Sequence, residues 1–125
     1  MIIRSGSCLC GQVRYNVKSD PIRIGLCHCM DCRKESGSAF AMFGIWPRHA
    51  FEASGEMRYF EGRGFCTSCG SRVFSEPEGA EVEIRVGSLD MAPTDVQPTY
   101  ELWVKRRENW LAPLEGAEQF EEDRI

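Results

Sequence analysis

The chain has 125 residues, of which 42% are hydrophobic and 27% charged, a size and composition typical of one globular domain with a modest core. Its net charge of -4 argues against nucleic acid as the main partner, because binding to phosphates requires concentrated lysine and arginine. The apolar start at residues 1–4 is too short for a signal peptide, and no run approaches the length of a membrane span. We therefore expect a soluble, cytoplasmic protein without a membrane partner.

Alternating apolar and polar residues predict short strands. In residues 12–18 the side chains of Val13, Tyr15 and Val17 share one face, which we expect to be buried. A second alternating run, residues 22–26, follows a Ser-Asp-Pro turn signal. We expect the two runs to form a hairpin.

The remaining apolar stretches are short and separated by glycine and proline. Further strands are predicted at 38–46, 57–61, 72–74, 81–86 and 100–105. Only residues 33–37 suggest helix, and at most one turn of it. The sequence therefore predicts an all-β domain of short antiparallel strands, held partly by metal, over residues 1–112, followed by a solvated acidic tail at 113–125.

The cysteines fall into close clusters. There are seven, and they are grouped as Cys8 with Cys10, Cys27 with Cys29 and Cys32, and Cys66 with Cys69. An odd number cannot pair completely within one chain, and neighbours in a Cys-x-Cys unit fit disulfide geometry poorly. Because an intracellular protein is also kept reduced, the clusters predict metal sites.

Two of these clusters are pairs, each of which could supply two of the four ligands of one metal site. The pair Cys8 and Cys10 and the pair Cys66 and Cys69 lie far apart in sequence, and two such pairs that meet give a closed, structural zinc site. A different partition, in which the central three thiols take one from another cluster, leaves cysteines without a role and is less economical.

The central cluster differs because it has three thiols. Cys27 and Cys29 lie on one side of an extended segment, and a turn at residues 30–31 brings Cys32 back beside them. Three protein ligands leave the fourth zinc position open for water or substrate, as in a catalytic site. Zinc is borderline soft, so an open site of three thiolates suits a thiol as the fourth ligand. We therefore expect two zinc ions per chain.

The order of these motifs resembles the glutathione-dependent formaldehyde-activating enzyme family, which includes the centromere protein V group. The similarity extends from about Arg4 to Leu111. It is carried by Gly6-x-Cys8-x-Cys10-Gly11-x-Val13, Cys27-His28-Cys29-x-x-Cys32-Arg33-Lys34-x-x-Gly37, Phe65-Cys66-x-x-Cys69-Gly70, Gly87-Ser88-Leu89-Asp90 and Leu102-Trp103-Val104. The resemblance implies a β-tent fold with a structural zinc on Cys8, Cys10, Cys66 and Cys69 and a catalytic zinc on Cys27, Cys29 and Cys32.

The resemblance also implies a function. We expect a zinc-dependent carbon-sulfur lyase that forms or cleaves the S-hydroxymethyl adduct of formaldehyde and a small thiol such as glutathione. The alternatives are a non-catalytic zinc scaffold or interaction module, and a different lyase or thiol-adduct hydrolase on the same scaffold. The roles of His28, Arg33, Lys34 and Glu101 are left open, as is the oligomeric state.

Overall fold

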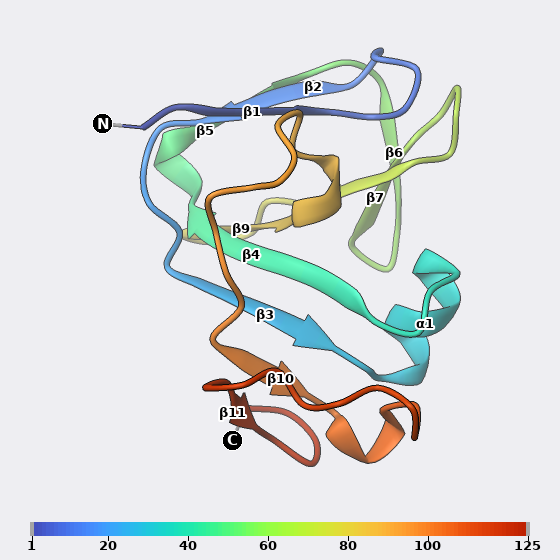
Figure 1. Cartoon of the computed structure of the whole chain (residues 1–125). Coiled ribbons are helices and arrows are strands. Elements are labelled where there is room, and N and C mark those ends of the chain that lie inside the picture. The colour runs from blue at the N-terminus through green and yellow to red at the C-terminus, as the bar shows by residue number, and fades with distance from the viewer. Residues whose placement is uncertain (1, 125) are drawn as a thin grey trace.

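The structure is a computed structural model that describes residues 2–124 (Figure 1). Within these residues it contains eleven strands, one α-helix and three short 3-10 helices. The strands are β1 (Arg4–Ser7), β2 (Arg14–Val17), β3 (Arg23–Cys27), β4 (Ala41–Pro47), β5 (Phe51–Ser54), β6 (Met57–Phe60), β7 (Arg63–Cys66), β8 (Arg72–Ser75), β9 (Glu81–Arg85), β10 (Tyr100–Leu102) and β11 (Glu118–Gln119). The helix α1 spans Met30–Ser36, and the 3-10 helices span Arg48–Ala50, Val86–Ser88 and Val104–Arg106.

The strands form two sheets. One has three strands in the order β1-β2-β5, and the other has eight in the order β11-β10-β3-β4-β9-β8-β7-β6. In Figure 1 the small sheet lies at the top, β3 and β4 run below it, and β10 lies at the bottom. Among the strands of residues 2–124, only β10 pairs in parallel, with β3 and β11. The prediction of an all-β domain is confirmed.

The main core lies between the small sheet and one face of the large sheet. Val13, Tyr15 and Val17 are buried there, as the alternation predicted. The large sheet contributes Trp46 and Ile84, both fully buried. Because successive side chains of a strand point to opposite faces, the alternate residues of β4 and β9 lie on the other face of the sheet, where the candidate site is found.

The hairpin predicted from residues 12–18 and 22–26 is wrong. β2 pairs with β1 and β5, whereas β3 pairs with β4 and β10. Between them the chain passes from one sheet to the other, and Trp46 fixes this crossing by donating its indole N–H to the carbonyl of Ser19 at 3.0 Å. Alternation identified the strands correctly, but it contains no information about which strands become partners.

The C-terminal segment also differs from the expectation. Residues 118–119 form β11, which pairs with β10, and Phe120 packs against a second apolar cluster around Tyr100 and Cys27. These residues are thus ordered against β10, although Glu118 and Gln119 are exposed to solvent. The domain boundary after residue 112 stays a prediction. Among residues 2–124 no helix has the length and apolar character needed to cross a membrane.

Candidate metal centres and the adjoining cavity

Four cysteines meet where the turn after β1 approaches the turn between β7 and β8. Their sulfur atoms all lie within 4.8 Å of one another, and this group, Cys8, Cys10, Cys66 and Cys69, is called the quartet. The sulfur of Cys10 lies 3.6 Å from that of Cys8 and 3.8 Å from that of Cys66. Tetrahedral coordination by thiolates at ordinary zinc distances requires sulfurs about 3.8 Å apart. The quartet therefore has the dimensions of a four-thiolate zinc site.

Donors surround the quartet sulfurs. The amide N–H of Val13 points at the sulfur of Cys8 over 3.2 Å, and the side-chain amide of Gln12 points at that of Cys66 over 3.1 Å. The hydroxyl of Ser71 lies 3.1 Å from the sulfur of Cys69 and is the main cause that lowers the pKa of this thiol to about 5. Hydrogen bonds to sulfur stabilise the thiolate, which is the form that binds metal.

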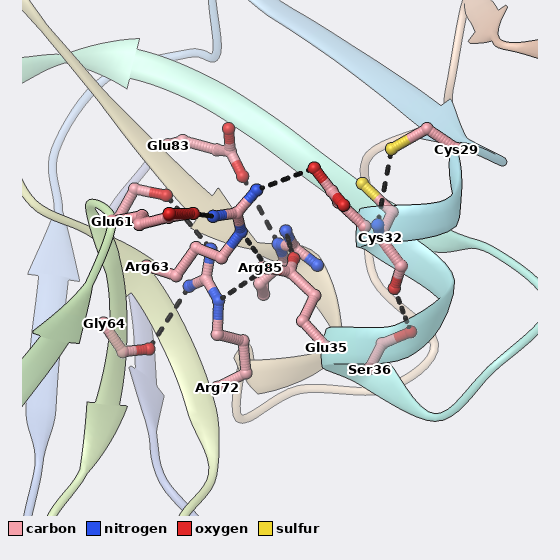
Figure 2. Close-up of polar contacts among 12 residues, drawn as sticks. Cys29, Cys32, Glu35, Ser36, Glu61, Arg63, Gly64, Arg72, Glu83 and Arg85 are labelled. Atoms are coloured by element: carbon pink, nitrogen blue, oxygen red, sulfur yellow. Dashed lines mark hydrogen bonds and ion pairs between the residues drawn. The ribbon is translucent and has the colours of Figure 1, made fainter.

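The second group, Cys27, Cys29 and Cys32, is called the trio, and its three sulfurs also lie within 4.8 Å of one another. Cys27 ends β3, and Cys29 is the N-cap of α1. The Cys29 sulfur accepts the amide N–H of Cys32 at 3.3 Å (Figure 2). This cap starts the helix three residues before the position at which the sequence suggested a helical turn. The cap thereby brings Cys32 against the other two thiols.

Both groups also contain thiols whose pKa is raised. At Cys10 of the quartet the backbone N–H of Gln12 lowers the pKa, but the neighbouring Cys8 thiol and burial raise it to about 11. Burial is the main cause that raises the pKa of Cys29, and the neighbouring Cys27 thiol together with burial raises that of Cys32. Three thiolates this close together repel one another, so ionisation of all three thiols is unfavourable unless a cation lies among them. Because a bound metal ion deprotonates the thiols that coordinate it, both groups fit a thiolate-preferring ion such as zinc. All seven thiols are free, and the identity of any bound ion stays a prediction.

No histidine joins either group within residues 2–124. His49 lies exposed in the first 3-10 helix, which argues against its use as a fourth ligand. His28, which lies between Cys27 and Cys29 in sequence, is fully buried, and its Nε2 atom lies 2.7 Å from the Oε1 atom of Glu101. Among the His, Cys, Asp and Glu side chains of residues 2–124, the trio therefore consists of three thiols without a fourth donor.

Cys27, Cys29 and Cys32 of the trio line a cavity of about 570 Å³, a volume typical of small-molecule sites. The cavity lies over the face of the large sheet opposite the main core. Apolar side chains of Phe43, Ile45 and Tyr100 line part of it. Its polar lining includes Arg23, Glu35, Arg63, Arg72, Glu83 and Arg85.

Three of these arginines, Arg63, Arg72 and Arg85, converge on the carboxylate of Glu35 from α1 and are called the arginine cluster (Figure 2). The Nε atom of Arg63 lies 2.6 Å from the Oε2 atom of Glu35, and the Nε atom of Arg72 lies 3.7 Å from the same oxygen. Arg85 forms an ion pair with the other oxygen. One carboxylate therefore faces three guanidinium groups beside the trio.

Only some residues of this cavity were predicted from the sequence, chiefly the three cysteines of the trio. Among the basic residues close in sequence to the cysteines, Arg72 lines the cavity, whereas Arg33 pairs with Glu108 at 2.7 Å and Lys34 is exposed. Arg85 belongs to β9, the strand predicted at residues 81–86, whose charged residues share the face opposite the buried Val82 and Ile84. That face does point away from the core, but it points into the cavity.

The comparisons with known proteins agree with this architecture. The model of the glutathione-dependent formaldehyde-activating enzyme family matches residues 3–106. The chain belongs to this family. The resemblance that rested on the cysteine motifs is confirmed, and glutathione and formaldehyde are the compounds in the name of the family.

One solved structure is similar in fold to this formaldehyde-activating-family chain. It is a Rhodobacter sphaeroides protein from a structural genomics programme, with a TM-score of 0.55 and 19% sequence identity. The match covers 71% of this chain and 91% of that one. At this identity the likeness concerns the fold alone. No curated protein is a significant match.

Proposed function

We propose that this protein is a zinc-dependent carbon-sulfur lyase that forms or cleaves the S-hydroxymethyl adduct of formaldehyde and an acidic thiol such as glutathione. The observation that carries the proposal is the position of the trio at the wall of a cavity that also holds the arginine cluster. A thiol-reactive centre and a carboxylate-binding centre within one cavity suit a small thiol that carries carboxylates.

The two groups of thiols receive different tasks in this proposal. Cys8, Cys10, Cys66 and Cys69 hold a closed structural zinc that ties β1 to β7, and Cys27, Cys29 and Cys32 hold the reactive zinc. Zinc at the trio supplies a place for a substrate sulfur and favours its thiolate form. The trio residues contribute by their fixed spacing, since β3 and the capped start of α1 hold their sulfurs on one side.

The overall reaction is balanced without an oxidant or reductant. In the forward direction the thiol sulfur attacks the formaldehyde carbon, a carbon-sulfur bond forms, and the carbonyl oxygen takes up the proton that the thiol loses. In the reverse direction the hydroxyl proton leaves, the carbon-sulfur bond breaks and the sulfur recovers a proton. Phe43, Ile45 and Tyr100 give the cavity an apolar wall beside the trio.

The arginine cluster binds and orients the thiol. Guanidinium groups match carboxylates in geometry and remain charged. Glu35 already lies among them as an internal carboxylate, and these ion pairs support the use of the cluster as a carboxylate-binding site. A substrate carboxylate that lies in the same cavity takes up the guanidinium N–H groups that Glu35 does not use. It thereby positions the sulfur near the trio.

The test is turnover of the glutathione-formaldehyde adduct by the zinc-loaded chain. The proposal expects turnover that Cys29→Ser abolishes while the chain stays folded, and that Arg58→Ala leaves unchanged, because Arg58 is exposed on β6 and does not line the cavity. Equal rates for Cys29→Ser and the unmodified chain, or no turnover above the uncatalysed reaction, would overturn it. The second result would favour a zinc scaffold without catalysis.

A further inference from the structure

A buried carboxylate lies directly behind the trio. Glu101 of β10 is 1% exposed and His28 is 0% exposed, and the His28 Nε2 and Glu101 Oε1 atoms are 2.7 Å apart. His28 is the residue between Cys27 and Cys29, so its side chain points away from the thiols while its backbone joins them. A group that fixes His28 therefore fixes the spacing of two thiols.

The backbone of His28 is held as well. β10 pairs in parallel with β3, with Leu102 opposite Cys27, and the amide N–H of His28 donates to the carbonyl of Leu102 at 3.0 Å. The ring of His28 also packs against that of Phe40, with centroids 5.7 Å apart. His28 is therefore restrained through both its backbone and its side chain by groups that lie outside the trio.

Glu101 is in turn fixed by the C-terminal segment, residues 114–120. Its Oε2 atom accepts the amide N–H of Leu114 at 2.7 Å and the side-chain amide of Gln119 at 2.9 Å, and Arg107 lies 3.5 Å from the same oxygen. Burial works to raise the pKa of Glu101. The bonds from Leu114, Gln119 and His28 and the charge of Arg107 outweigh it and lower that pKa to about 2. The carboxylate is thus an ionised acceptor at neutral pH, and the Nε2 atom of His28 is the donor to it.

The backbone of the same segment reinforces this arrangement. β11 pairs with β10 so that Gln119 lies opposite Glu101, and the amide N–H of Phe120 donates to the carbonyl of Glu101 at 2.9 Å. Further along, Asp123 and Arg124 reach the wall of the cavity itself. The C-terminal segment, Asp123 and Arg124 all lie beyond residue 106, where the match to the family model ends.

We infer that the C-terminal segment is a working part of the trio centre: through Leu114 and Gln119 it holds the Glu101 carboxylate, and Glu101 holds His28 and thereby the spacing of Cys27 and Cys29. Glu101 is a positioning residue in this scheme, because it does not touch the substrate. The inference rests on the proposed function only in so far as the trio holds a metal. Partners of this kind behind a metal site change metal affinity or activity by about 10-fold to 100-fold when they are removed.

The experiment measures the release of zinc from the doubly loaded chain to a colorimetric chelator, with Cys29→Ser used to identify the phase that belongs to the trio. Glu101→Ala is expected to speed release from the trio about tenfold and to leave release from the quartet unchanged. Glu101→Gln is expected to speed release from the trio by less than Glu101→Ala, since its amide oxygen still accepts from Leu114 and Gln119 but its NH2 group faces the Nε2 donor of His28. Gln119→Ala should act in the same direction as Glu101→Ala and by less.

Glu118→Ala is the matched control, because Glu118 is an exposed neighbour in β11 whose side chain does not contact Glu101. The inference would be overturned if Glu101→Ala released zinc from the trio at the rate of the unmodified chain. It would also be overturned if release from both sites became faster by the same factor, since a merely structural role of Glu101 would loosen both sites. If Glu101→Ala does not fold, Gln119→Ala compared with Glu118→Ala decides in the same way. A chain that binds one zinc ion contradicts the proposed function instead, so the two failures are distinguishable.

Discussion

The Nε atom of Arg63 lies 2.6 Å from the Oε2 atom of Glu35, so that an arginine from β7 and a carboxylate from α1 meet at the cavity beside the trio. Replacement of Arg63 by alanine removes one of the three guanidinium groups that face this carboxylate. We expect KM for the glutathione-formaldehyde adduct to rise about tenfold, the size of one charge-assisted hydrogen bond. We expect kcat to change little, because the interaction holds the substrate equally before and during reaction.

Arg58→Ala is the control for this prediction, since Arg58 lies on the neighbouring strand β6 and is exposed. Steady-state kinetics with both variants measures the two constants separately. A fall in kcat without a change in KM for Arg63→Ala would show that the arginine cluster does not serve substrate binding.

Gly64 lies in β7 between Arg63 of the arginine cluster and Cys66 of the quartet, so its packing helps to place both residues. A Cβ atom on Gly64 would lie 2.2 Å from the carbonyl oxygen of Phe74, which belongs to the backbone and cannot move away easily. Gly64→Ala is therefore expected to lower the free energy of unfolding by about 1–3 kcal/mol, the usual cost of overpacking. Gly87→Ala is the control, since nothing lies within 4 Å of its added carbon. Equal denaturation midpoints of the two variants would contradict the packing described here.

Asp95 gives a prediction for pH dependence. Arg4 donates to both of its carboxylate oxygens, at 3.1 and 2.8 Å, and these bonds lower the pKa of Asp95. Because the folded pKa lies below the unfolded value of about 3.9, the contribution of Asp95 to stability is complete above that pH and is lost as the pH falls through the folded pKa. Asp95→Asn should therefore lower Tm at pH 7, and the difference from the unmodified chain should shrink below about pH 4.

Asp20 provides the comparison for this pH effect, because it lies 3.8 Å from the same arginine but its side chain is 85% exposed. Asp20→Asn is expected to change Tm very little at any pH. A Tm difference for Asp95→Asn that persists unchanged to pH 2 would show that the charge of Asp95 is not its source.

Metal removal should affect the two groups of thiols unequally. Cys8 and Cys66 of the quartet are buried within the main core, and a metal there joins strands of both sheets. Structural zinc contributes directly to folding free energy. Cys66→Ser is therefore expected to lower Tm strongly, whereas Cys29→Ser lowers it much less, as thermal unfolding followed by circular dichroism would measure. A larger loss in Cys29→Ser would reverse the assignment of structural and reactive sites.

Local pattern predicted seven of the eleven strands described in residues 2–124 and the grouping of the cysteines, because both depend on spacing along the chain. It missed β1, β5, β7 and β11. Val13, Tyr15 and Val17 are buried as their alternation indicates, and the quartet and the trio are assembled from the predicted thiols. Their use as zinc ligands stays a prediction.

The parts that the sequence did not predict depend on contacts between distant segments. β3 pairs with β10 instead of β2, and Arg85 faces a cavity instead of solvent. Gln119 lies in the predicted acidic tail, but its side-chain amide donates to the carboxylate of Glu101, which is 18 residues away in sequence. Neither periodicity nor charge pattern specifies such partners.

Metal content per folded chain tests the central claim most directly. Two zinc ions for the unmodified chain and one for Cys29→Ser, with the fold retained, is the result expected if the quartet is closed and the trio holds an ion of its own. A single zinc ion in the unmodified chain, or two in Cys29→Ser, would contradict the division of the seven thiols into two centres.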